Sequence, residues 1–160
     1  MITAARTTSC LAALLLAIAA GVAGCTLPRM TGDQMRVADE QTLWKHLHEQ
    51  MFSAMLYGQA DALYTAGLRR ELMERYYPGT PPEHRQLVMM GEVENGMDQV
   101  SVSLAWGRPW GIGTDVTAWG QIDRWWWGPQ DRPYREATFR DAELVWWIIH
   151  DHQWRHRRYR

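Results

Sequence analysis

The spacing of apolar residues divides the chain into an apolar start, a helical half and a half with strand character. Residues 10–23 form an almost wholly apolar run, which is shorter than the roughly 20 residues of a membrane-spanning helix. Between residues 34 and 77, apolar side chains recur at helical spacing. After the prolines of residues 78–82 the apolar segments are shorter, and the last of them are rich in aromatic and β-branched residues.

Two helices are predicted between residues 34 and 77. The first, over residues 34–57, has an apolar side chain at every fourth position: Leu43, Leu47, Met51 and Met55. The second, over residues 61–77, repeats this spacing: Tyr64, Leu68, Leu72 and Tyr76. Gly58 lies between them and favours a break, so we interpret the segment as a helical hairpin. One long bent helix is the alternative.

Two shorter helices and a glycine-rich loop are expected next. Pro82 suits a first helical turn, which predicts a short helix over residues 83–90. A second helix, over residues 97–106, has three residues on its apolar face: Met97, Val100 and Leu104. Residues 107–121 are rich in glycine and are predicted to form a loop.

Three antiparallel strands are predicted at the end of the chain, over residues 122–127, 134–140 and 143–149. Asp141-Ala142 is the expected two-residue turn between the last two strands, and a regular ladder from this turn sets Ala137 opposite Trp146. Tyr134 and Trp147 then share a half-apolar second face. Since a face open to water is normally polar, we expect the helical hairpin or another protein to cover it.

The apolar start ends at a cysteine. Val22-Ala23-Gly24-Cys25 resembles the lipobox of bacterial lipoproteins. The resemblance implies that residues 1–24 are a signal peptide, that the chain is cut between Gly24 and Cys25, and that Cys25 carries fatty acyl chains such as palmitate. Cys10 lies in the removed segment, so an unmodified Cys25 would be a lone thiol in an oxidising compartment. An ordinary secreted protein with a chance cysteine is the alternative.

The mature chain, residues 25–160, has the size of one domain and is nearly neutral. It holds 16 basic and 18 acidic residues, a net charge of −2, because only Arg6 among the charged residues lies before Cys25. This balance gives no electrostatic reason to expect a nucleic-acid partner. All 10 tryptophans lie in the mature part, so a few large side chains could hold a small fold together.

Three segments follow one another in an order found in a known family: "GEVENGMDQVSVSLAWGRP", "WWWG" and "ATFRDAELVWW". The residues that carry the pattern are Gly96, Met97, Val100, Gly107 and Pro109, followed by the aromatic strand and the Phe139/Leu144 pair. The order resembles the SmpA/OmlA, or BamE-like, lipoproteins of the outer membrane. The resemblance implies an α+β domain over residues 82–150. Residues 25–33 would be its tether, and the hairpin of residues 34–77 would precede it.

No segment has the pattern of a catalytic or metal site. The mature serines, Ser53, Ser101 and Ser103, lie outside any nucleophile-elbow motif, so we expect no enzymatic activity and no cofactor. His152 and His156 are four residues apart, as two metal ligands on one helix could be. We interpret residues 151–160 instead as a basic, aromatic tail and expect no metal.

The sequence thus predicts a lipid-anchored α+β protein: a helical hairpin followed by a two-helix, three-stranded antiparallel domain. Thr26 follows the lipidated cysteine where lipoproteins retained in the inner membrane tend to have Asp, so we expect the outer membrane and a periplasm-facing domain. The family resemblance implies a non-enzymatic scaffold or accessory in outer-membrane protein assembly or maintenance. Trp126, Tyr134 and Trp147 are the predicted partner face. The alternatives are a binding module for a small ligand, glycan or target protein, and an inhibitor-like domain.

Overall fold

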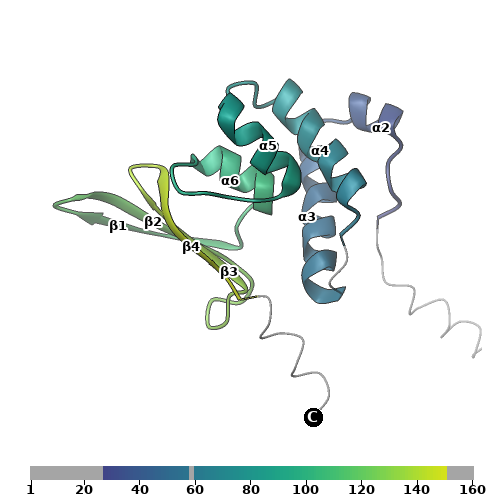
Figure 1. Ribbon diagram of the computed structural model, residues 1–160. Helices are drawn as coiled ribbons and strands as arrows, with labels where there is room; N and C mark the ends of the chain where they lie inside the picture. Colours follow the sequence, from purple (N-terminus) through teal and green to yellow (C-terminus); the bar gives the residue numbers. More distant parts are fainter. Residues whose placement is uncertain (1–26, 58–59, 151–160) are drawn as a thin grey trace, which may run out of the picture.

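The computed structural model describes residues 27–57 and 60–150, which form an α+β fold (Figure 1). Within these ranges five helices precede a four-stranded antiparallel sheet of order β1-β2-β3-β4. The helices are α2 (Gly32–Val37), α3 (Glu40–Tyr57), α4 (Ala62–Arg75), α5 (Pro82–Met90) and α6 (Gln99–Trp106). The strands are β1 (Gly111–Thr117), β2 (Gly120–Trp127), β3 (Arg135–Arg140) and β4 (Glu143–Ile149). The predicted signal peptide and basic tail lie outside the described residues.

The helix predicted over residues 34–57 is in fact two helices. Thr31 caps α2 in a capping box: its hydroxyl accepts from the Gln34 N–H, and the Gln34 side chain accepts from the Thr31 N–H. Ala38 is extended and ends α2, and Asp39 then accepts from the Thr42 N–H at the start of α3. The prediction missed these cap signals, and the end of its tether, from Gly32 on, is helical.

The predicted helical hairpin is confirmed in α3 and α4. Glu40 at the start of α3 accepts a hydrogen bond from Tyr77, just after α4, and His46 Nδ1 lies 2.9 Å from the Tyr64 hydroxyl. The first contact joins the start of α3 to the end of α4, and the second joins α3 to the first turn of α4, so the two helices lie side by side and the alternative of one long bent helix is wrong. Both helices contribute fully buried leucines to the hairpin: Leu43 and Leu47 of α3, and Leu68 and Leu72 of α4.

A buried arginine joins the hairpin to α5 and α6. Arg69 is 4% exposed and donates from Nε to the Leu104 carbonyl (3.1 Å) and from Nη2 to the Ala105 carbonyl (2.7 Å). Its Nη1 donates to the Met89 carbonyl (3.3 Å). These acceptors lie in the last turns of α6 and α5, where helix carbonyls are unsatisfied and carry partial negative charge. Burial lowers the pKa of Arg69 to about 10, so the side chain stays a cation at neutral pH.

The two short helices are confirmed, but the buried face of α6 differs from the prediction. Asp98 caps the helix and its carboxylate accepts from the Ser101 N–H (2.9 Å), so Met97 precedes α6 instead of beginning it. Val100, predicted to lie on the apolar face, is 41% exposed. The apolar side chains that α6 buries are Val102, Leu104, Ala105 and Trp106.

The prediction of three strands is wrong, because β1 lies inside the predicted loop. Gly111 pairs with Trp126 of β2, and a Cβ atom at position 111 would lie 2.1 Å from Trp126 Cζ2. The indole ring therefore covers the glycine backbone. Glycine weakens a strand because it has no side chain to pack, and an aromatic residue on the neighbouring strand supplies that packing. The composition of residues 107–121 alone does not show that a tryptophan of the neighbouring strand will pack over Gly111.

The predicted turn at Asp141-Ala142 is present, with positive φ angles of 50° and 71°. The first two pairs of the predicted ladder, Arg140 with Glu143 and Phe139 with Leu144, are confirmed, but the later pairs are wrong because the register shifts between Thr138 and Phe139. Thr138 is opposite Trp146 and Ala137 is opposite Trp147. This β-bulge adds a residue to β4, and one added residue reverses the face of every residue that follows.

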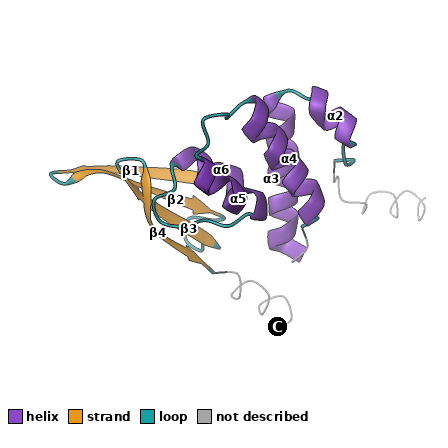
Figure 2. Ribbon diagram, turned by 45° about the horizontal axis from the view of Figure 1, so that its top comes forward, coloured by secondary structure: helices purple, strands orange, loops and turns teal. Residues whose placement is uncertain are grey.

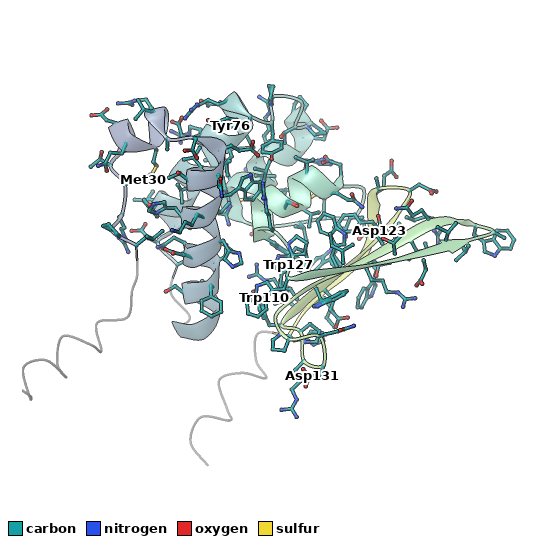
Figure 3. All side chains as sticks on the ribbon, turned by 180° about the vertical axis from the view of Figure 1, so that it is seen from behind. Met30, Tyr76, Trp110, Asp123, Trp127 and Asp131 are labelled. Atoms are coloured by element: carbon teal, nitrogen blue, oxygen red, sulfur yellow. The ribbon has the colours of Figure 1, made fainter. Side chains whose placement is uncertain are left out.

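The part of the core next to the sheet lies between α6 and one face of the sheet, which we call the helix face. The ring of Trp106 in α6 meets Trp127 edge-on, with centroids 5.2 Å apart, and Trp147 in the same way at 6.0 Å. The Arg135 guanidinium lies over the Trp106 ring, 5.1 Å from its centroid. Trp127 and Trp110 project between the sheet and the helices in Figure 3.

Candidate functional site

The opposite side of the sheet, the outer face, is the candidate functional site. The helices of the described part all lie on the other side (Figure 2). Following the registers, the side chains of the outer face include four apolar ones, Ile122, Trp126, Trp146 and Ile148, and six polar or charged ones, Asp115, Arg124, Glu136, Thr138, Arg140 and Glu143. A solvated sheet face is normally polar, and the apolar residues of this one include two tryptophans, which is typical of a surface that contacts something else.

The apolar part of the outer face runs along β4. Trp146 is 48% exposed, Val145 beside it is exposed, and Ile148 is half-buried. Trp146 lies opposite Thr138 and Ile148 lies opposite Glu136, so polar residues of β3 border the apolar row. Exposed aromatic and aliphatic side chains with a polar rim are the usual composition of a protein interface.

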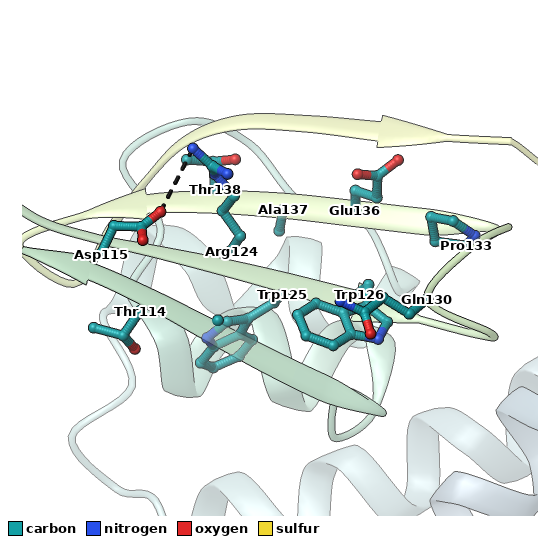
Figure 4. A pocket seen from close by; sticks show the side chains of 11 residues that line it. Thr114, Asp115, Arg124, Trp125, Trp126, Gln130, Pro133, Glu136, Ala137 and Thr138 are labelled. Atoms are coloured by element: carbon teal, nitrogen blue, oxygen red, sulfur yellow. Dashed lines mark ion pairs between the residues drawn. The ribbon is translucent and has the colours of Figure 1, made fainter.

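A groove of about 350 Å³ lies on the outer face across β1, β2 and β3 (Figure 4). Trp126 forms part of its wall, and Asp115 and Arg124 form an ion pair at 3.6 Å on one side. Glu136 also lines the groove and pairs with His150 Nε2 at 3.0 Å. The groove therefore combines one aromatic ring with charged groups that are already paired with one another.

The structure places the predicted partner residues in three different settings. Trp126 lies on the outer face, half-buried over Gly111. Tyr134 is buried and meets Trp110 edge-on at 6.4 Å between ring centroids. Trp147 lies on the helix face against Trp106, because the bulge reverses its side of the sheet. The three do not form one surface, and Trp146 takes the outer position that the regular ladder gave to Trp147. Gly24 and Cys25 lie outside the described residues.

The β1–β2 hairpin is a feature that the sequence prediction missed. It extends beyond the helices in Figure 1 and carries Trp119, 85% exposed, in its turn. The Thr117 hydroxyl holds the turn: it donates to the Gly120 carbonyl (2.9 Å) and accepts from the Trp119 N–H (3.1 Å). Because residues 107–121 were predicted to be a loop, nothing indicated that this tryptophan would project from a strand pair.

A buried carboxylate fastens this hairpin to α6. Asp123 of β2 accepts from the Thr114 hydroxyl (2.7 Å) of β1, from Gln121 Nε2 (3.0 Å) and from Gln99 Nε2 (2.7 Å) of α6. The hydrogen bond from Thr114, followed by those from Gln121 and Gln99, lowers the pKa of Asp123 below its ordinary value. Ionised Asp123 is therefore stabilised in the folded protein.

Replacing Asp123 with asparagine is expected to destabilise the fold at neutral pH, and the difference from wild type should shrink in acid. Since the folded pKa lies below the ordinary value, near 3.8, the carboxylate contributes stability above that pH and loses it as pH falls through the folded pKa. Urea unfolding of both proteins at pH 7 and near pH 3 measures this. A difference that is constant with pH would show that the ionised group does not stabilise the fold.

A serine, an aspartate and a histidine meet at the start of α6, but their order does not suit nucleophilic catalysis. Ser101 Oγ donates to Asp98 Oδ2 (2.6 Å), and His84 Nδ1 lies 3.7 Å from the same oxygen. In a catalytic triad the histidine contacts the serine, whereas Asp98 stands between them here. Ser101 is also fully buried. The arrangement caps the helix.

Within residues 27–57 and 60–150, no three His, Cys, Asp or Glu side chains gather closely enough to hold a metal ion. None of the helices described there has the length and hydropathy to cross a membrane. Comparison of the chain with protein-family models, with curated proteins and with solved structures found no match.

Proposed function

We propose that this protein is an outer-membrane lipoprotein whose folded part faces the periplasm. There it acts as a non-enzymatic scaffold or accessory in the assembly or maintenance of outer-membrane proteins. The anchor is supported by the sequence Val22-Ala23-Gly24-Cys25 at the end of a short apolar run. The envelope role is supported by the resemblance of residues 82–150 to SmpA/OmlA domains.

The observation that carries the proposal is the apolar row along β4 on the outer face, where Trp146 is exposed and Ile148 is half-buried. Docking of an envelope protein there would bury Trp146, Val145 and Ile148, and burying a large apolar side chain contributes about 1.5–3 kcal/mol. Acyl chains at Cys25 would confine the domain to the membrane surface and so raise its effective concentration near its partners. The lipid anchor would therefore add to the free energy that burial of the apolar row contributes.

The test is complementation in a strain that lacks the gene. Deletion is expected to lower the amounts of outer-membrane barrel proteins, and the wild-type gene should restore them. Trp146→Glu should fail to restore them, since a carboxylate in the centre of a desolvated contact is strongly unfavourable. Quantitative mass spectrometry of the outer-membrane fraction gives the readout, and intact-mass analysis of the purified protein shows whether Cys25 carries lipid.

Trp119→Glu is the matched control, because it places the same charge at an exposed tryptophan away from the outer face. It should restore the barrel proteins fully. Thermal melting followed by circular dichroism must show both variants folded. Unchanged barrel-protein amounts after deletion, or full complementation by folded Trp146→Glu, would contradict the proposal.

A lipid-anchored glycan-binding module is the second candidate, and the groove beside Trp126 favours it. An aromatic ring next to carboxylates and an arginine is a suitable surface for a sugar ring with its hydroxyl groups. Quenching of tryptophan fluorescence by soluble fragments of envelope glycans in the wild type, and its loss in Trp126→Phe, would support this function over the scaffold.

A further inference from the structure

The free edge of β4 carries no charged side chain along most of its length. Leu144 to Ile149 is a run of six apolar residues, and in the described part of the chain the strand that β4 pairs with is β3, apart from an isolated bridge between Glu143 and Asp98. The other edge strand, β1, contains two glycines and Asp115. Proteins usually protect an edge strand with charges, proline or a covering segment, because its free N–H and C=O groups attract another strand.

The first part of this edge is already occupied. The Leu144 N–H donates to the Met97 carbonyl (2.8 Å), and the Gly96 N–H donates to the Leu144 carbonyl (2.8 Å). The bulge follows directly, at Val145. A regular strand can therefore pair only with residues 146–150, whose central residue is Ile148.

The ladder with β3 shows which backbone groups face outward. The His150 N–H donates to the Tyr134 carbonyl (2.6 Å), next to the pair Arg135–Ile149. Because successive residues of an antiparallel strand point their N–H and C=O groups to opposite sides, Ile148 also bonds toward β3. Trp147 and Ile149 then present their N–H and C=O groups to the free edge.

We propose that two copies of this chain pair antiparallel through β4 about a two-fold axis at Ile148. Trp147 of each copy then exchanges two backbone hydrogen bonds with Ile149 of the other. Opposed residues also share a face: Trp147 and Ile149 lie on the helix face, and Ile148 lies on the outer face of both copies. The two sheets join into one of eight strands with a continuous outer face.

Charge complementarity makes a second copy the fitting occupant. The chain continues beyond His150 for ten residues outside the described range, with four arginines and one aspartate. In the two-fold register the last described residue, His150, lies opposite Trp146 of the second copy, on the side of its β3–β4 turn, which carries Asp141 and Glu143 beside Arg140. The central strand itself sets no like charges against each other. The pairing is independent of the proposed envelope role.

Disulfide cross-linking tests the axis. In the purified protein, compared with the same protein without the substitution, Ile148→Cys sets two thiols directly opposite each other across the axis. Such residues have Cα atoms about 4.5–5.5 Å apart, within the range a disulfide spans. Mild oxidation in detergent should convert most of the protein to a disulfide-linked dimer. Val116→Cys, on the exposed β1 edge, should remain mainly monomeric. Equal cross-linking of the two variants would overturn the pairing.

Substitutions of opposite charge at position 148 test whether the strand that pairs with this edge belongs to a second copy of the chain. Ile148→Lys and Ile148→Glu should each sediment as monomers in detergent, because each sets like charges face to face. A mixture of the two should recover the dimer. Circular dichroism melts check that both variants fold. A monomeric wild type at all concentrations, or folded single variants that stay dimeric, would refute the axis at Ile148, whatever the complementation experiment shows.

Discussion

Replacing Arg69 with methionine is expected to lower the free energy of unfolding by about 3–5 kcal/mol. Arg69 connects α4 to the ends of both α5 and α6. It donates hydrogen bonds to the carbonyls of Leu104, Ala105 and Met89. Methionine fills similar space but donates no hydrogen bond, so buried carbonyls lose their partner. Desolvation of these groups, rather than loss of packing, dominates the cost.

Chemical denaturation followed by tryptophan fluorescence measures this effect. Arg70→Met is the matched control, because Arg70 follows on the same helix, carries the same charge and is exposed. Its effect should stay within about 0.5 kcal/mol, as for most surface substitutions. Similar losses in both variants would show that a general effect on α4, and not the hydrogen bonds of Arg69, determines the stability.

Trp106→Ala is the second substitution with a large expected effect, a loss of about 3–5 kcal/mol. Trp106 is 2% exposed and joins α6 to the sheet through Trp127, Trp147 and Arg135. Alanine removes these contacts at once and leaves a cavity that the rigid sheet cannot close. Trp147 then loses the ring that holds it on the helix face, so local order at the end of β4 should also fall.

Trp119→Ala makes the same chemical change at an exposed position of the β1–β2 hairpin. We expect a change within about 0.5 kcal/mol there. Urea titration of both variants gives the free energies, and amide hydrogen exchange along β4 reports the local effect. Should Trp106→Ala be as stable as Trp119→Ala, the aromatic cluster would not be the centre of the core.

The elements with strong local signals could be predicted from the sequence. Leu68 and Leu72 at helical spacing, Asp61 before them and proline after them define α4 without reference to any other segment. The turn at Asp141-Ala142 follows from the local sequence too, because these two residues separate two segments that each have the composition of a strand. Where the prediction failed, the deciding contact comes from another part of the chain.

For the candidate site too, local sequence predicted one part, and contacts between distant segments decided the rest. That some aromatic residues must lie on a second, uncovered face follows from three consecutive tryptophans on a strand. The bulge at Val145 decides which aromatic residues of β4 lie on that face. A prediction that assumes regular pairing from the turn does not include this bulge. Arg69 gave no signal at all, because its partners are backbone carbonyls of helices that follow it by twenty residues or more.

The sequence by itself determined the helical hairpin, the two short helices and three of the strands, since periodicity, caps and turns act between near neighbours. The tertiary structure alone decided that a glycine-rich segment becomes β1, that Trp146 rather than Trp147 faces outward, and that a buried cation holds the helices together. Each of these rests on a contact between distant segments: an indole over Gly111, a one-residue register shift, and helix-end carbonyls around Arg69. Such contacts exist only once the chain has folded.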